Sequence, residues 1–332
     1  MSPEEPLVSV VIPVRNGERL VGRTLASALA QTYRNIEVIV VDDGSTDRTP
    51  ALVENAAARD RRVRLLRRPH SGVTATRNFG ISRANGSLIA PLDADDLWYQ
   101  EKIARQVAAM QISSPKVGLV YCWCVDIDEN DLIIPPVANK SIAAGSVLAE
   151  LVEKGNFLAS GSVPLIRRSC FDAVGGYDSD LQAAEDWKLY LALSEICEFA
   201  VVPAHLVGYR RSSGSASNNT TVMERDMERV SRWIMDKWPD VHQKVKWRMI
   251  YYQNCYLAHL SLTNNRFAKA LHYQARAYQA RPMGLFALGT LFGFGVRLLA
   301  RLLRIRRAAP RIPFKDFQPK LQFAEGPAIK QQ

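Results

Sequence analysis

The chain has 332 residues, of which 47% are hydrophobic and 23% are charged, a composition that excludes disordered and collagen-like proteins and predicts about two domains. The formal net charge is +10, and residues 297–332 account for +7 of it, with nine Lys and Arg residues against two acids. A basic tail on a nearly neutral body argues against a nucleic-acid-binding protein and indicates a localised anionic partner.

The first part of the chain alternates between short apolar runs and amphipathic stretches. Runs rich in β-branched residues predict strands, and stretches with apolar residues along one face predict helices. In chain order, the predicted elements are strand 8–12, helix 18–32, strand 37–41, helix 50–59, strand 63–66, helix 74–84, strand 88–92, helix 97–110 and strand 117–125. Strands separated by helices of this kind predict an α/β fold, with a mainly parallel sheet covered on both faces.

The second part of the chain has a weaker pattern and then becomes helical. Residues 126–145 contain a Pro-Pro pair and predict an exposed loop, and residues 212–221 are small and polar, as in a flexible loop. The remaining predicted elements are helices 147–154 and 185–195, strands 199–202 and 206–209, and helices 223–238, 241–262 and 266–280. We expect three regions, which are an α/β domain over 1–215, a helical hairpin region over 216–282, and a basic amphipathic segment and tail over 283–332.

Acidic residues follow two of the predicted strands directly. Asp42 and Asp43 come after one strand, and Asp93, Asp95 and Asp96 come after another. Ligands of open α/β sheets bind outside the carboxyl ends of the strands. Carboxylates gathered there suit Mg²⁺ or Mn²⁺, which take oxygen ligands and keep positions open for substrate phosphates. Asp also ends strands and caps turns in proteins without such a site, but five acids in two equivalent places favour the metal site.

Four segments follow one another in the first part of the chain: VSVVIPVRNG, QTYRNIEVIVVDDGSTD, TRNFGI and PLDADD. In this order and spacing they resemble the N-terminal half of family 2 glycosyltransferases of GT-A fold, closely over residues 8–109 and more loosely to about residue 212. The resemblance implies a Rossmann-like sheet, a nucleotide-sugar donor that is expected to be UDP-linked, and a divalent cation, Mn²⁺ or Mg²⁺. It also implies transfer of the sugar to an acceptor hydroxyl with inversion.

The resemblance implies residues that bind the nucleotide-sugar. Pro13 and Arg15 match positions that line the pocket of the nucleotide base, where a guanidinium can stack or bind phosphate. Asp43, which follows Asp42, matches the carboxylate that accepts a hydrogen bond from the base. Arg77 matches a basic residue near the nucleotide.

Two acidic motifs complete the implied site. Asp93 and Asp95 match the DXD motif, in which we expect Asp95 to bind the metal and Asp93 to bind the metal or a sugar hydroxyl. Glu185 and Asp186 resemble the ED motif, whose Asp is the catalytic base. Displacement at an anomeric carbon needs a base on the acceptor and a neutralised leaving group on the opposite side. The alternative is that both acids only complement the dipole of a helix that starts there.

An uncharged apolar stretch, residues 283–296, runs into a basic one. Its fourteen residues span about 21 Å as a helix, less than the roughly 30 Å of a bilayer core. Arg297, Arg301 and Arg304 share one helix face, which predicts a segment lying in an anionic membrane surface. A buried helix and a transmembrane span are the alternatives. Membrane attachment fits a carbohydrate or lipid-linked acceptor in cell-envelope synthesis.

The cysteines and the N-terminus predict a cytoplasmic location. The five cysteines include one C-x-C pair, Cys122 and Cys124, and match neither a disulfide framework nor a zinc site. The acidic N-terminus does not predict a secretory signal. We therefore expect a protein of the reducing cytoplasm that is peripheral to the membrane.

Two other functions were compatible with parts of the sequence. A nucleotidyltransferase shares the sheet and the carboxylate–metal chemistry, but it usually has a glycine-rich phosphate loop where this chain has Pro-Val-Arg-Asn-Gly. A catalytically silent scaffold would keep the α/β domain as a platform. Hydrolysis of nucleotide-sugars in the presence of Mn²⁺ distinguishes the scaffold from an enzyme.

Overall fold

The computed structural model describes residues 5–135, 141–211, 219–240, 243–280, 295, 298 and 312–316. Eight strands in these residues form one sheet. They are β1 (Val8–Val14), β2 (Ile36–Asp42), β3 (Val63–Arg67), β4 (Leu88–Pro91), β5 (Leu97–Trp98), β6 (Val117–Ile127), β7 (Leu165–Arg167) and β8 (Glu198–Arg210). The strand order is β3-β2-β1-β4-β7-β6-β8-β5.

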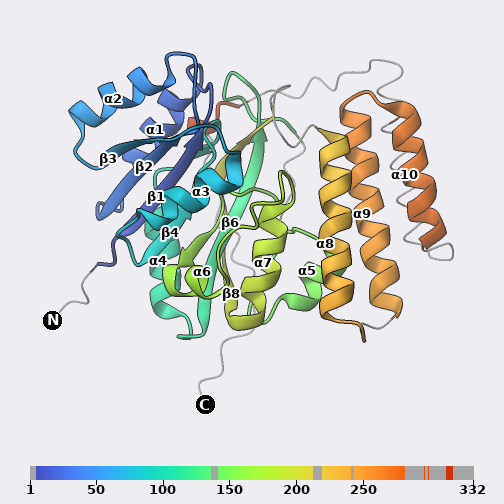
Figure 1. Ribbon diagram of the computed structural model, residues 1–332. Helices are drawn as coiled ribbons and strands as arrows, with labels where there is room; N and C mark the ends of the chain where they lie inside the picture. The colour runs from blue at the N-terminus through green and yellow to red at the C-terminus, as the bar shows by residue number, and fades with distance from the viewer. Residues whose placement is uncertain are drawn as a thin grey trace.

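Helices pack against the sheet and extend beyond it at one side (Figure 1). They are α1 (Val21–Leu29), α2 (Thr49–Arg59), α3 (Val73–Ser82), α4 (Lys102–Ile112), α5 (Leu148–Lys154), α6 (Arg168–Ala173), α7 (Glu185–Ile196), α8 (Thr220–Lys237), α9 (Gln243–Thr263) and α10 (Phe267–Ala280), and a 3₁₀ turn spans Phe314–Asp316. Every residue of β1 and β2 is buried, as in a sheet that is covered on both faces.

The sheet is mostly parallel, which confirms the predicted α/β class. Strands β1, β2, β3 and β4 run parallel to one another, so their carboxyl ends meet at one edge. Strand β7 is antiparallel to both of its neighbours, β6 and β8 are parallel, and β5 is an antiparallel edge strand. The loops that carry the acidic motif after β4 and the first strand's Pro-Val-Arg-Asn-Gly segment therefore leave the sheet at the same edge.

The structure corrects three of the predicted elements. Leu97 and Trp98, predicted to begin a helix, pair with β8 as a strand. The two strands predicted over 199–202 and 206–209 form the single strand β8, whose register against β6 jumps from Val202 to His205. The proline between them sits in this irregularity, where it costs no ladder hydrogen bond. The three-residue strand β7 was not predicted, because it is too short to show a period.

The helices α8, α9 and α10 stand side by side next to α7 and α5 (Figure 1). Met223, Met227 and Val230 of α8 are buried in the same apolar cluster as the sheet. Arg248 of α9 forms an ion pair with Glu153 of α5, with 2.9 Å between Nη1 and Oε2. The helical region is thus packed onto the α/β part and contributes to its core.

No helix among the described residues is both long and apolar enough to cross a membrane. The predicted membrane-surface segment, 283–304, lies outside the described residues except for positions 295 and 298. Most of the polar loop predicted over 212–221 also lies outside them.

Helix α3 lies unusually close to the sheet at Gly80. A Cβ atom there would come within 2.6 Å of Cγ1 of Val11 and 2.8 Å of Cγ2 of Val41. Since α3 also carries Arg77, this contact places that side chain relative to the edge of the sheet. A Cβ atom added at Gly22, in α1, would have no neighbouring atom within 4 Å.

We predict that Gly80→Ala lowers the free energy of unfolding by about 1–2 kcal/mol, because the added methyl group overpacks the contact between α3 and the sheet. Gly22→Ala is the matched control, and its better helix propensity should leave stability unchanged or raise it by up to about 1 kcal/mol. Urea denaturation of the two variants measures both effects. Equal stability of the two variants would contradict the close packing.

Candidate functional site

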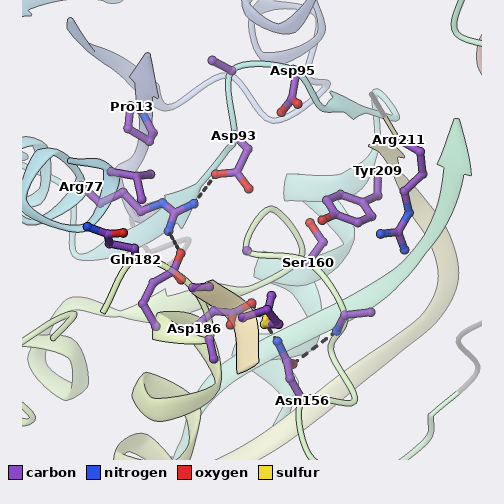
Figure 2. Close-up of a pocket in the computed structure, with 18 of the residues that line it drawn as sticks. Pro13, Arg77, Asp93, Asp95, Asn156, Ser160, Gln182, Asp186, Tyr209 and Arg211 are labelled. Atoms are coloured by element: carbon purple, nitrogen blue, oxygen red, sulfur yellow. Dashed lines mark hydrogen bonds and ion pairs between the residues drawn. The ribbon is translucent and has the colours of Figure 1, made fainter. Parts of the chain in front are cut away.

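A cavity of about 970 Å³ opens at the carboxyl edge of the parallel strands and reaches α8 and α9. Six of the residues predicted for the site line it, namely Pro13, Arg15, Arg77, Asp93, Asp95 and Asp186. Figure 2 shows Asp93 and Asp95 on one side of the cavity and Asp186 on the other. The structure therefore brings together acidic residues that are about ninety positions apart in the chain.

Arg77 joins the two sides of the cavity (Figure 2). Its guanidinium donates to Asp93 through Nη2 and to Oε1 of Glu185, at 2.5 Å, through Nη1. The side chain is buried and lies against the ring of Tyr177, 5.4 Å from the ring centre. Burial alone would lower the pKa of Arg77, but the charges of Asp93 and Glu185 outweigh it and hold the pKa above its usual range.

The acidic turn after β4 contains two carboxylates with opposite surroundings. Asp96 is fully buried and accepts hydrogen bonds from Oγ of Ser162 at 2.6 Å, Oγ of Ser160 at 3.2 Å and the backbone N–H of Arg210 at 2.8 Å. Asp95 faces the cavity, and its carboxylate has no hydrogen bond or ion pair with another described residue. Burial and the charge of Asp93 raise the pKa of Asp95 to about 6. Asp96 therefore anchors the turn, while Asp95 is left free to bind a ligand.

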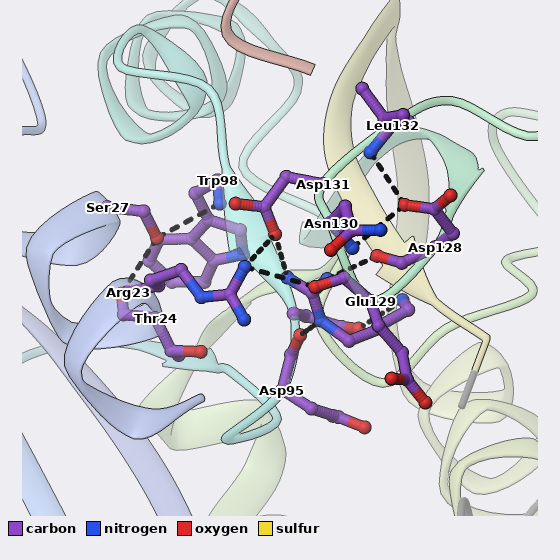
Figure 3. A network of polar contacts seen from close by, with 12 residues as sticks. Arg23, Thr24, Ser27, Asp95, Trp98, Asp128, Glu129, Asn130, Asp131 and Leu132 are labelled. Carbon is purple, nitrogen blue, oxygen red and sulfur yellow. Dashed lines mark hydrogen bonds and ion pairs between the residues drawn. The ribbon is translucent and has the colours of Figure 1, made fainter. Parts of the chain in front are cut away.

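A buried arginine of β8 holds the backbone of the same turn. Arg210 donates through Nε to the backbone carbonyl of Asp95 at 2.6 Å and through Nη2 to Oδ1 of Asp131 at 2.6 Å. Asp131 also accepts from Arg23 of α1 at 2.9 Å, and Arg23 reaches the backbone carbonyl of Glu129 (Figure 3). The turn after β6 thus ties α1, β8 and the acidic turn together on one side of the cavity.

Asp186 lies at the start of α7, on the opposite side of the cavity from Asp95 (Figure 2). Its Oδ2 accepts from Nδ2 of Asn156 at 2.7 Å, and its Oδ1 accepts from the backbone N–H of Trp187 at 2.7 Å. Burial and the charge of Glu185 raise the pKa of Asp186 to about 7. Near neutral pH, a carboxyl group with this pKa is present in both its ionised and its protonated form, so it can accept a proton from a substrate.

The loop before Asp186 is held by a carboxylate of the helical region. Oδ2 of Asp226, in α8, accepts from the backbone N–H groups of Gln182 at 2.8 Å and Ala183 at 3.0 Å, and the side chain is fully buried. Ala184 follows with a φ of 57°, in the left-handed region that costs a non-glycine residue energy. Asp226 therefore helps to impose the backbone turn from which Asp186 points into the cavity.

The structure does not bring Asp42 and Asp43 to the cavity. Oδ1 of Asp43 accepts from the backbone N–H of Ser71 at 2.8 Å, and its Oδ2 contacts Nδ1 of His70 at 2.7 Å and the backbone N–H of Gly72 at 3.0 Å. Asp42 accepts from the backbone N–H of the turn after β2 and is 99% buried. The side chain of Asp43 holds the loop that leads into α3, and that of Asp42 holds the turn after β2. The predicted contact of Asp43 with a nucleotide base stays a prediction.

The donor set at the acidic turn fits a hard divalent cation. Asp95 offers a carboxylate that has no partner among the described residues, beside the carboxylate of Asp93, and the rest of the coordination sphere is left to ligand oxygens or water. The described residues contain no group of three or more His, Cys, Asp or Glu side chains that could hold a metal by themselves. A site of this kind would hold its cation together with a phosphate-bearing ligand.

Several residues of the site were missed at the level of sequence. Asn156 and Arg210 act on Asp186 and Asp95, and Asp226 acts on the loop before Asp186, each across at least thirty positions of the chain. Nothing in their local pattern distinguishes them from solvent-exposed polar residues. Ser160 and Ser162 contact Asp96, more than sixty positions earlier in the chain, so only the tertiary structure reveals this interaction.

The sequence matches the family described as Glycosyl transferase family 2 over residues 9–175. A protein of Haemophilus influenzae named as an uncharacterized glycosyltransferase is 40% identical over 137 residues, which cover 41% of this chain and 54% of the relative. A protein of Rickettsia typhi with a similar name is 31% identical over 188 residues, covering 56% of this chain and 58% of the relative. The chain thus spans a little over half the length of these relatives.

Solved glycosyltransferase structures share the fold. TarS 1-349 of S. aureus in complex with UDP-GlcNAc matches with a TM-score of 0.61 at 15% identity, covering 96% of this chain and 97% of TarS 1-349. The mannosyltransferase PcManGT from Pyrobaculum calidifontis, in complex with GDP-Man and Mn²⁺, matches with a TM-score of 0.57 at 20% identity, covering 91% and 83%. These neighbours have the GT-A fold, so the predicted GT-A architecture is confirmed.

We predict that Asp226→Ala loosens the loop before Asp186, because two buried backbone N–H groups lose their acceptor. The free energy of unfolding should fall by about 2–4 kcal/mol. Amide exchange over residues 182–184, followed by mass spectrometry, should become faster. Asp236→Ala is the control, since Asp236 is exposed on the same helix. Unchanged exchange in Asp226→Ala would show that Asp226 does not hold the loop.

Proposed function

The chain belongs to glycosyl transferase family 2, and on that premise we propose that it transfers a sugar from a UDP-linked donor to an acceptor hydroxyl with inversion. The proposal depends on one observation above the others. The carboxylates of Asp93 and Asp95 face Asp186 across a single cavity, and Arg77 connects the two sides. Inverting displacement needs this separation, because the nucleophile enters and the leaving group departs on opposite sides of the anomeric carbon.

The donor is proposed to bind at the edge of the sheet. Asp95, together with Asp93, would hold Mn²⁺ or Mg²⁺, which when bound neutralises the charge that develops on the departing diphosphate. Arg15 is exposed at the cavity and has no hydrogen bond or ion pair with another described residue, so it can bind phosphate or stack on the base. Pro13 lines the same end of the cavity. The structural neighbours TarS, in complex with UDP-GlcNAc, and PcManGT, in complex with GDP-Man and Mn²⁺, support a nucleotide-sugar donor and a divalent cation.

Asp186 is proposed to be the general base. Its carboxylate takes the proton from the acceptor hydroxyl as the oxygen attacks the anomeric carbon. Asn156 donates to Oδ2 of Asp186 and so orients the carboxylate, while Glu185 is engaged by Arg77. The charges of Glu185, Arg77 and Asp93 act on Asp186. The two negative charges favour its protonated form and raise its pKa, and Arg77 lowers the pKa.

We propose a cellular role at a membrane. The basic amphipathic segment and tail over 283–332 would bind an anionic membrane surface, and the transferase would act there in cell-envelope or glycolipid synthesis. The scaffold alternative is decided by donor hydrolysis with Mn²⁺, which a silent protein would not catalyse.

We predict that Asp186→Asn lowers turnover by about 10²- to 10⁴-fold, because the amide cannot take the acceptor proton. Calorimetry should show UDP bound with Mn²⁺ at nearly the affinity of the unmodified protein, since the donor contacts lie across the cavity. Asp180→Asn, at an exposed position just before α7, is the control and should keep full turnover.

The pH profile separates loss of a base from loss of structure in this experiment. Ionised Asp186 is the active form, so kcat/KM should rise with pH through an apparent pKa near 7 and reach a plateau above it. The residual rate of Asp186→Asn should lack this rise. A variant that keeps near-normal turnover, or the same pH dependence, would remove Asp186 from the role of base.

We predict that Asp95→Ala abolishes the dependence of UDP binding on Mn²⁺, because the cation loses the carboxylate that has no other partner. Titration of UDP with and without Mn²⁺, followed by calorimetry, measures the effect. Asp240→Ala is an exposed control. Mn²⁺-dependent binding of unchanged strength in Asp95→Ala would exclude the proposed metal ligand.

A further inference from the structure

The side of the cavity that lies beyond Asp186 is built by the helical region. Met223 and Met227 of α8 and Tyr252, Gln253 and Tyr256 of α9 line the cavity. None of these residues belongs to the motifs that bind a donor at the edge of the sheet. In an inverting transfer the acceptor reaches the base from the side opposite the metal, and α8 holds the loop that presents Asp186.

Tyr256 presents an aromatic face next to the base. Its side chain is 41% exposed although it lines a cavity, and its hydroxyl has no hydrogen bond with another described residue. Asp186 and Arg211 line the same cavity as Tyr256. A large aromatic ring left uncovered in the cavity that contains the proposed base is suited to hold the molecule on which the base acts.

Tyr252 lies one helical turn before Tyr256, on the same face of α9. Its ring is held by Tyr251, with 5.3 Å between ring centroids and 75° between the planes. Gln253 is tied to α8 by a hydrogen bond of 2.8 Å to Oγ of Ser231. The two tyrosines therefore project from a helix that is fixed to its neighbours, and a ligand would meet a surface that needs little ordering.

We propose that Tyr252 and Tyr256 form the binding surface for a sugar ring of a carbohydrate acceptor, and this rests on the proposed function. The C–H groups of a sugar face pack on the electron-rich faces of aromatic rings, while its hydroxyls need polar partners around them. Asn156 and Gln253 supply amides and Asp186 supplies the base at the rim of this surface. A purely lipidic acceptor suits this surface less, because covering the polar groups at its rim with an alkyl chain, which offers no hydrogen bonds, costs free energy.

The test uses simple methyl glycosides as probes: those of glucose, galactose, mannose and N-acetylglucosamine. Saturation-transfer NMR is recorded with the full chain, Mn²⁺ and UDP. At least one glycoside should bind the unmodified protein, and Tyr256→Ala should weaken it about tenfold. Tyr256→Phe should restore binding, because it keeps the ring and loses only the hydroxyl. Tyr252→Ala should act in the same direction as Tyr256→Ala.

Tyr278→Ala is the matched control, since Tyr278 is a 40% exposed tyrosine of α10 that does not line the cavity. Melting temperatures verify that all variants fold. The proposal is overturned if no glycoside binds, if Tyr256→Ala binds as the unmodified protein does, or if 1-octanol displaces the glycoside and so reveals a lipid site. Failure of UDP to bind with Mn²⁺ overturns the proposed function and this proposal with it, whereas UDP binding without a tyrosine-dependent glycoside overturns this proposal alone.

Discussion

The buried guanidinium of Arg77 is the contact on which the rest of the site depends. It joins α3, the acidic turn after β4 and the start of α7. A charge removed from water in this way is tolerated only when opposite charges and hydrogen bonds compensate it, and Asp93 and Glu185 provide both. Asp93 lies two residues before Asp95, and Glu185 directly precedes Asp186. One ion-pair cluster therefore fixes both sides of the cavity. The close approach of α3 to the sheet at Gly80 sets where that cluster can form.

The surroundings of each carboxylate, more than its place in a motif, separate structural from chemical roles. Asp96 and Asp43 follow strands in the same way as Asp95 does, yet several donors already occupy their oxygens. Among the described residues, the carboxylate of Asp95 has no hydrogen-bond or ion-pair partner, whereas Asp186 has a raised pKa and accepts from the side chain of Asn156 and the backbone N–H of Trp187. Within one turn, Asp96 is thus a structural anchor and Asp95 is the proposed ligand site. The number of hydrogen-bond donors around each carboxylate separates the two roles.

The sequence was sufficient to predict the fold class, the positions of most strands along the chain and the presence of acids after two of them. These features depend on local periodicity and on the general position of ligands in α/β sheets. It was insufficient where a tertiary contact decides. Leu97 and Trp98 read as the start of a helix but complete the sheet beside β8. The rule that acids after strands face the ligand applied equally to Asp95, which lines the cavity, and to Asp43, which does not, because the rule takes no account of the loop that folds over Asp43.

The helical region completes the site, because its residues act on the same few atoms as the motifs do. Asp226 of α8 holds the backbone that presents Asp186, and the tyrosines of α9 stand beyond it. Removing these helices would therefore leave two backbone N–H groups without their acceptor and open one wall of the cavity. The family match ends at residue 175, before α7 and α8 begin. The helices that are proposed to bind the acceptor thus lie outside the matched region. This is expected if the members of a family share the chemistry of the donor and differ in their acceptors.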